Sequence, residues 1–205
     1  MNAPLKVVLI GTTTTGKTSI VRRMVHGIFH AHSDCTIGAS FIKYNNGNIK
    51  YELWDTAGQE RFHALLPMYF RSARILIFVF DVSNPKSMDD FDRYTRTVGT
   101  LEHYKILIIG NKIDLVTPDE LQMMNTQIRK KIENSGFVNK TYDYVFTSAK
   151  TGENFDILLQ TLNKCAMEIS SSLSNGTIQE TNIIALNDKN TDLSTKNNDS
   201  YKCYC

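Results

Sequence analysis

A phosphate-binding pattern near the N-terminus constrains this chain more than any other feature. Residues 11–18 read GTTTTGKT and follow directly on the short apolar run LKVVLI at 5–10. The pattern G-x-x-x-x-G-K-[ST] between a buried strand and a helix is typical of a loop whose backbone N–H groups surround phosphate oxygens. An ordinary polar loop is the alternative, and the flanking strand and helix make it the weaker interpretation. We expect a nucleoside triphosphate to contact Thr14, Thr15, Gly16, Lys17, Thr18 and Ser19, with the Lys17 ammonium on the β- and γ-phosphates.

Two further loops predict which base is bound. An Asp114 carboxylate after the buried run KILII can accept hydrogen bonds from the N1–H and exocyclic amine of guanine, which adenine does not offer. The stem of Lys112 can pack over the base, and the Ala149 N–H can donate to guanine O6. Because loops at the carboxyl ends of neighbouring strands form the ligand crevice of an open α/β sheet, these loops should meet. The predicted base site comprises Asn111, Lys112, Asp114, Ser148, Ala149 and Lys150.

The stretch DTAGQ at 55–59 predicts a metal site and a hydrolytic step. Asp55 should hold Mg²⁺, directly or through water, together with the Thr18 hydroxyl. Thr36 should complete the metal shell only when the γ-phosphate is present. Gly58 can place its N–H against that phosphate, and Gln59 is the candidate catalytic residue that orients an attacking water.

Hydrophobic patterning predicts an α/β fold with a mostly parallel six-stranded sheet, one antiparallel edge hairpin and helices on both faces. An Asn-Gly turn at 46–47 predicts the hairpin. The expected strands are 5–10, 41–44, 49–55, 74–81, 105–111 and 144–148, and the expected helices are 16–26, one beginning near Ser83 and Pro85, 117–136 and 154–169.

Composition narrows the function classes. The chain has 205 residues, 23 Lys+Arg against 21 Asp+Glu, and thus a formal net charge of +2, which gives no reason to expect a nucleic-acid partner. No run approaches the roughly 20 apolar residues of a spanning helix, and the N-terminus lacks a secretory signal. The 4 cysteines form no disulfide framework and fit a reducing cytosol.

Taken together, GTTTTGKT, TIGASF, WDTAGQERF, GNKIDL and SAK stand in an order that resembles the Ras superfamily of small GTPases, most closely the Rab branch. The resemblance covers residues 5–170 and the last three residues. It implies a P-loop NTPase G domain at 1–171 with GTP/GDP and Mg as cofactors. TIGASF with HALLPMYFRSA resembles the endosomal Rab subgroup. The resemblance also implies that Phe29 packs against the guanine edge.

The same resemblance implies a switch rather than a metabolic enzyme. Segments 28–40 and 56–70 would become ordered around the γ-phosphate and relax after hydrolysis. Phe41, Trp54 and Tyr69 match an aromatic triad that presents an effector surface, although core packing is a strong alternative role for them. The implied partners are an exchange factor, a GTPase-activating protein, effectors, a prenylation escort and a GDI-like chaperone, acting on a monomer at the cytoplasmic face of endosomal membranes. The alternative function is a non-hydrolysing adaptor; an ATP-using kinase is disfavoured by Asn111 and Asp114.

Two departures from the family pattern affect these expectations. Thr13 and Thr14 stand where the family often has Gly, Ser or Ala. A β-branched side chain disfavours positive φ and can crowd Gln59, so we expect slow intrinsic hydrolysis with normal nucleotide binding. The segment between Phe91 and Gly110 is several residues shorter than is usual in Rabs, which puts partner contacts there in doubt.

Residues 172–205 have the composition of a disordered tail, with a docked strand at TNIIAL as the alternative. The tail ends in Cys203 and Cys205. By resemblance, this Cys-x-Cys ending is a signal for two prenyl groups, which give stable anchoring where one lipid gives only marginal binding. A metal pair or a disulfide is the alternative.

Overall fold

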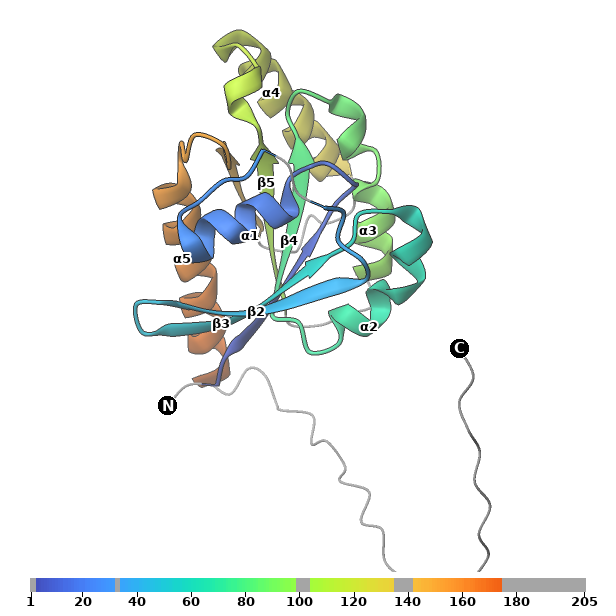
Figure 1. Cartoon of the computed structure of the whole chain (residues 1–205). Coiled ribbons are helices and arrows are strands. Elements are labelled where there is room, and N and C mark those ends of the chain that lie inside the picture. The colour runs from blue at the N-terminus through green and yellow to red at the C-terminus, as the bar shows by residue number, and fades with distance from the viewer. Residues whose placement is uncertain (1–2, 32–33, 99–103, 135–141, 175–205) are drawn as a thin grey trace, which may run out of the picture.

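The computed structural model describes residues 3–31, 34–98, 104–134 and 142–174 (Figure 1). Six strands form one sheet in the order β2-β3-β1-β4-β5-β6. All neighbours pair in parallel except β2 and β3, which form an antiparallel hairpin at one edge. The predicted fold class is confirmed. The strands are β1 (Leu5–Ile10), β2 (Ala39–Asn46), β3 (Ile49–Thr56), β4 (Ile75–Asp81), β5 (Lys105–Asn111) and β6 (Tyr142–Thr147).

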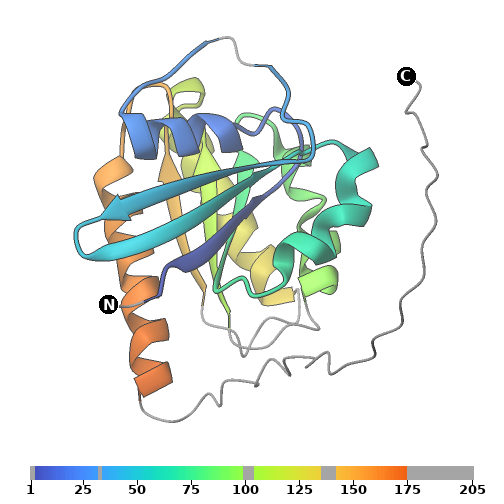
Figure 2. The same ribbon diagram turned by 60° about the horizontal axis from the view of Figure 1, so that its bottom comes forward.

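Helices cover both faces of the sheet (Figures 1 and 2). In β1, Val7 and Leu9 pack with α1 and α5, whereas Val8 and Ile10 pack with α2, α3 and α4. This alternation gives a strand buried on both faces, as its continuous apolar sequence predicts. The α-helices are α1 (Lys17–His26), α2 (Leu66–Phe70), α3 (Phe91–Val98), α4 (Pro118–Asn134) and α5 (Phe155–Ser174), and the 3₁₀ helices are η1 (Glu60–Leu65), η2 (Pro85–Met88) and η3 (Ile113–Leu115).

The single helix expected from Ser83 onward was wrong. The structure has the short η2 there and begins α3 only at Phe91. Ser83 caps no helix, because its N–H and its hydroxyl both donate to Asp81 Oδ1. The Ser87 hydroxyl bonds back to the segment that precedes it, where it contacts the Asn84 carbonyl at 2.7 Å. Such local side-chain bonds compete with a continuous helix.

At the C-terminal end of the domain, α5 continues to Ser174 rather than stopping at 169. The tail from 175 onward, with Cys203 and Cys205, lies outside the described residues, as does part of the shortened segment at 99–103. Among the described helices, none combines the length and the apolar character needed to cross a bilayer.

Candidate functional site

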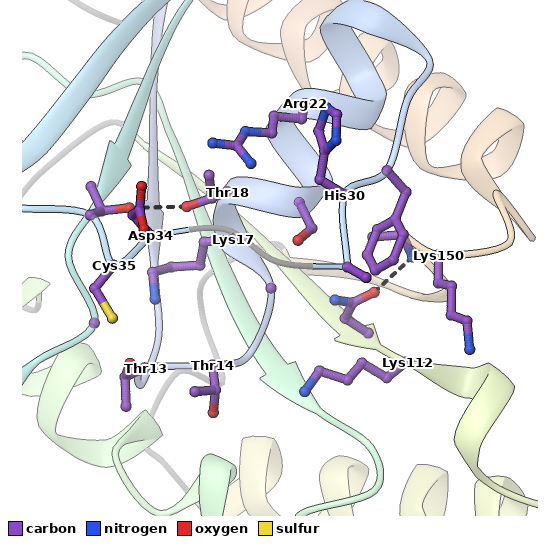
Figure 3. A pocket seen from close by; sticks show the side chains of 18 of the residues that line it. Thr13, Thr14, Lys17, Thr18, Arg22, His30, Asp34, Cys35, Lys112 and Lys150 are labelled. Atoms are coloured by element: carbon purple, nitrogen blue, oxygen red, sulfur yellow. Dashed lines mark hydrogen bonds between the residues drawn. The ribbon is translucent and has the colours of Figure 1, made fainter.

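A cleft of about 710 Å³ lies at the carboxyl ends of β1, β5 and β6, between the loops that follow these strands (Figure 3). Three predicted residues, Thr15, Asp55 and Ser148, are buried and each contacts a residue of the cleft. The structure therefore brings together side chains from the whole length of the domain. The predicted residues that line the cleft are Thr14, Gly16, Lys17, Thr18, Ser19, Phe29, Thr36, Gly58, Gln59, Asn111, Lys112, Asp114, Ala149 and Lys150.

The phosphate-binding loop is held closed by its own polar groups. Lys17 Nζ donates to the carbonyls of Gly11 at 2.8 Å and Thr12 at 2.9 Å, and the Thr15 hydroxyl donates to the Thr12 carbonyl at 3.0 Å. Burial lowers the pKa of Lys17 to about 8, against the opposing charge of Asp55. The loop thus places a buried ammonium at the N-terminus of α1. A phosphate bound there would be attracted both by the ammonium and by the partial positive charge of the helix N-terminus.

The metal corner of the cleft is built from oxygen atoms. Thr18 Oγ1 donates to Asp55 Oδ2 at 2.6 Å and lies 3.0 Å from Thr36 Oγ1. The other carboxylate oxygen, Asp55 Oδ1, is buried and has no hydrogen-bond partner in the described part of the chain. An orphaned carboxylate oxygen beside two hydroxyls fits a hard divalent cation. The described residues contain no group of three or more His, Cys, Asp or Glu that could hold a metal ion. Mg²⁺ is usually held by one or two carboxylates together with waters and substrate phosphates, which fits the single carboxylate found here.

The base corner centres on Asp114. Ser148 Oγ donates to Asp114 Oδ1, and the Lys150 ammonium lies 3.8 Å from Asp114 Oδ2. The side chain of Asp114 therefore has a fixed orientation before any base arrives. Lys112 has a left-handed backbone with φ 70°, and its ammonium pairs with Asp81 Oδ2 at 2.6 Å. This pair fixes the head of Lys112 and leaves its stem to pack over a base.

Asn111 connects the phosphate loop to the base loop. Its side-chain N–H donates to the Thr15 carbonyl at 2.9 Å, and its Oδ1 accepts from the Ala149 N–H at 3.0 Å. The N–H expected to bind guanine O6 thus has a protein partner in this structure. Asn111 also lies so close to Gly16 that a Cβ there would sit 2.3 Å from Asn111 Nδ2.

The hydrolytic residues lie against the phosphate loop. A Cβ at Gly58 would sit 2.5 Å from both the Thr13 nitrogen and Lys17 Nζ, so only glycine allows this approach. Gln59 lines the cleft, but its Oε1 accepts from Arg61 Nε at 2.7 Å. Arg61 therefore competes with any water for the Gln59 side chain.

Comparison with known proteins shows the family of this chain. Residues 6–168 match the Ras family. The chain belongs to the Ras family. It is 36% identical over 168 residues to Ras-related protein Rab-5A of Dictyostelium discoideum, covering 78% of this chain and 79% of that protein. It is 38% identical over 166 residues to GTP-binding protein YPT53 of Saccharomyces cerevisiae, covering 78% and 75%, and 38% identical over 162 residues to Ras-related protein RABF2a of Arabidopsis thaliana, covering 75% and 76%.

These similarities make the chain a Rab-type small GTPase of the endosomal Rab5-like group, as the sequence motifs predicted. Its reaction is the hydrolysis of GTP to GDP and phosphate. Membership in a family of hydrolases argues against the alternative of a non-hydrolysing adaptor.

The unusual threonines of this GTPase differ from one another in the structure. Thr14 adopts φ 63°, whereas Thr13 is not among the described residues with positive φ. Both side chains are exposed and line the cleft. Thr14 therefore has the strained backbone, whereas the side chains of Thr13 and Thr14 both narrow the cleft.

The aromatic triad of this GTPase divides between surface and core. Phe41 is 44% exposed, whereas Tyr69 is 8% exposed and belongs to the core. Trp54 lies between them, with ring centroids 5.3 Å from Phe41 and 6.0 Å from Tyr69. The two expected roles, core packing and a docking surface, are thus combined in one row of rings.

Sequence reasoning missed several residues in or beside the cleft. Asp81 pairs with the cleft residue Lys112 and could have been found, because it ends the apolar run of β4 at the same edge of the sheet as Asn111. Arg22 is one helical turn after Thr18, a spacing that places both on one face of α1. His30, Asp34 and Cys35 line the cleft from the segment after α1, and no pattern in the sequence singles them out.

Proposed function

We propose that this chain is a membrane-anchored Rab-like switch that binds GTP or GDP with Mg²⁺, hydrolyses GTP slowly and recruits effectors in endosomal traffic. The observation that carries the proposal is the convergence, in one cleft, of the Lys17 ammonium, the orphaned Asp55 oxygen and the oriented Asp114 carboxylate. These three groups are complementary to the phosphates, the metal and the guanine edge of one ligand.

Guanine is the base that the cleft suits. Asp114, Phe29 and Lys112 line the cleft, where Asp114 would accept from the two N–H groups of guanine while Phe29 and the stem of Lys112 would pack against the ring. Ser148 and Lys150 keep the carboxylate in place. The Ala149 N–H reaches guanine O6 only by sharing or leaving its bond to Asn111, so Asn111 is the group that adjusts on binding.

Hydrolysis is proposed to depend on Gln59. Bound Mg²⁺, held by Thr18, Thr36 and Asp55, would offset the charge that develops on the β- and γ-phosphates. Lys17 and Gly58 line the cleft, where the Lys17 ammonium would hold the phosphate oxygens and the Gly58 N–H would face the γ-phosphate. Gln59 must leave Arg61 to orient a water, and the Thr13 and Thr14 side chains narrow the space in which it does so. Both features support slow turnover until a GTPase-activating protein intervenes.

Switching is proposed to act on an exposed apolar surface beside the cleft. Ile37 is 82% exposed, and Phe41 and Met68 are also exposed. Thr36 and Gly58 flank this surface, so their contacts to a γ-phosphate would reach it directly. Effectors are proposed to bind here, and exchange factors to act on the same two segments.

The membrane part of the proposal rests on the tail and on the relatives. Cys203 and Cys205 are proposed to carry two prenyl groups, with an escort for attachment and a GDI-like chaperone for cycling of the monomer through the cytosol. The similarity to Rab-5A and YPT53 supports an endosomal site of action for this chain.

One binding experiment tests the central assignment. Calorimetry of the full chain with GDP and with ADP, in Mg²⁺, should show binding of the guanine nucleotide only, and Asp114→Ala should lose it. Equal affinity for both nucleotides would contradict the proposal.

Two further variants test the other parts of the proposal. Gln59→Leu should keep GTP binding and lose hydrolysis. In cells, a Cys203→Ser/Cys205→Ser variant should leave the membrane.

A further inference from the structure

Arg23 contacts the base corner from outside the cleft. It stands in the last turn of α1, its side chain is partly buried, and it is not one of the residues that line the cleft. Its Nε donates to the carbonyl of Ala149, 126 residues later in the chain, and one Nη donates to the Lys150 carbonyl at 2.8 Å. The guanidinium thus holds two consecutive carbonyls of the loop that follows β6.

The loop is shaped around this guanidinium. Gly152 has φ 88°, and a Cβ there would sit 3.2 Å from an Arg23 Nη atom. On another side, the centroid of the Phe155 ring lies 5.9 Å from Arg23 Cζ. A planar guanidinium can bond two carbonyls and pack over a ring at the same time, which an ammonium cannot do. The local geometry therefore calls for arginine and not merely for a positive charge.

Ala149 is the residue whose N–H is proposed to meet guanine O6. The peptide that carries this N–H is fixed at the Ser148 carbonyl, which accepts from the Gly152 N–H at 2.8 Å. The following peptide is fixed by Arg23 through the Ala149 carbonyl. Ala149 is therefore restrained on both sides, and the Arg23 contact ties it to the helix that begins at the phosphate loop.

Arg23 also restrains a second segment that approaches the base. Gly27 donates its N–H to the Arg23 carbonyl at 2.9 Å, and its own carbonyl accepts from Arg23 Nη at 3.3 Å. Phe29, which is proposed to pack against guanine, follows shortly after Gly27 and lines the cleft. One side chain thus joins the two segments that would contact the base.

A basic side chain in the last turn of a helix often serves only the carbonyls of its own helix end. That role accounts for the contact to Gly27, but the Ala149 and Lys150 carbonyls lie outside α1. We propose that Arg23 is a positioning residue for guanine, which holds the Ala149 N–H where it meets O6. This inference rests on the contact between Ala149 and guanine O6 in the proposed function. Without Arg23, the phosphate contacts remain, but the loop that carries Ala149 is free to shift.

The test compares GDP with 6-thio-GDP. In the second nucleotide sulfur, a weak acceptor, replaces O6, while the two N–H groups that face Asp114 are kept. Each nucleotide competes with a ribose-labelled fluorescent GDP for the full chain in Mg²⁺. The wild type should prefer GDP by about fivefold, as expected for the loss of one hydrogen bond. Arg23→Gln should weaken GDP by about tenfold but 6-thio-GDP by only about twofold, so that the preference disappears.

Two variants serve as comparisons. Arg23→Lys keeps the charge but not the planar donor group, so it should lose the preference as well, and it carries the comparison if Arg23→Gln does not fold. Arg96→Gln removes the same group from α3, where Arg96 Nε donates to the Asp92 carbonyl of its own helix. It should bind both nucleotides as the wild type does. Melting curves in saturating GDP and Mg²⁺ check that each variant is folded.

The outcomes separate this inference from the proposed function. If the wild type binds GDP and 6-thio-GDP equally, the contact to O6 itself is wrong and the inference falls with it. If the wild type prefers GDP but Arg23→Gln weakens both nucleotides equally, or neither, only the inference is overturned, because Arg23 is then merely structural. A full preference in Arg23→Lys, or its loss in Arg96→Gln, would overturn the inference too.

Discussion

The strained backbone of Thr14 yields a stability prediction that can be worked from one dihedral angle. Thr14 has φ 63°, a left-handed conformation that costs a residue with a Cβ about 1–2 kcal/mol. Thr14→Gly removes that strain but gives the unfolded chain more freedom, which costs about 0.4–1 kcal/mol. The midpoints of these two ranges leave a net gain of about 0.8 kcal/mol. For a domain of this size, that corresponds to a rise in melting temperature of about 1–4 °C.

Thr13→Gly is the matched control. Thr13 precedes Thr14 in the same loop, is also exposed at the cleft and lacks a positive φ. It therefore gains no relief of strain and should lower the melting temperature. Both variants lose the same side chain, so their difference isolates the backbone effect. Thermal unfolding is measured in saturating Mg²⁺ and GDP, because bound nucleotide adds its own stabilisation. If Thr14→Gly melts at or below Thr13→Gly, the strain argument is wrong.

Three further outcomes follow from the geometry of the cleft and its surroundings. Burial and the Arg93 charge lower the pKa of His63, so the folded protein favours the neutral ring. The contribution of His63 to the free energy of unfolding should therefore be fully present above the unfolded pKa of 6.5 and be lost as the pH falls below it. In melting curves, His63→Gln should flatten this pH dependence. The pKa of Lys17, lowered by burial to about 8, should rise when phosphate binds, so nucleotide affinity should decline and proton uptake should grow above pH 8 in calorimetry. Gly58→Ala should slow GTP hydrolysis by roughly 10²-fold in a phosphate-release assay while GDP still binds, because the added Cβ moves this segment away from the phosphate loop; unchanged turnover would show that the close approach is not needed.

The sheet was predictable because its signals are local. Strands β4 and β5 are continuous apolar runs, and β2 and β3 flank an Asn-Gly turn. The helix from Ser83 was mispredicted because Asp81 and Ser87 form side-chain bonds that helical periodicity does not reveal. Helix propensity was overridden there by local bonds between the side chains and the backbone of Asp81, Ser83, Asn84 and Ser87.

The residues of the cleft were predictable as a set, but their partners were not. Motif spacing places Gln59, Lys112 and Ala149 at the correct edge of the sheet. It does not reveal that Gln59 is bound by Arg61, or that Lys112 is paired with Asp81. Such partners come from side-chain directions, which depend on packing around each loop. The sequence therefore predicted the side chains that line the ligand site. It did not predict the protein partners that these side chains bind in the structure without a ligand.

Asn111 shows why that distinction matters for the mechanism. It was predicted as part of the base site, and its amide bonds the Thr15 carbonyl and the Ala149 N–H and so joins the phosphate loop to the base loop. Its substitution would disturb both loops at once, whereas the loss of Asp114 would remove only the recognition of the base. Asn111→Ala should therefore weaken binding of GDP and of a base-modified nucleotide alike, while Asp114→Ala should weaken GDP far more. A selective loss in Asn111→Ala, measured by competition between the two nucleotides, would return Asn111 to the role of a base reader.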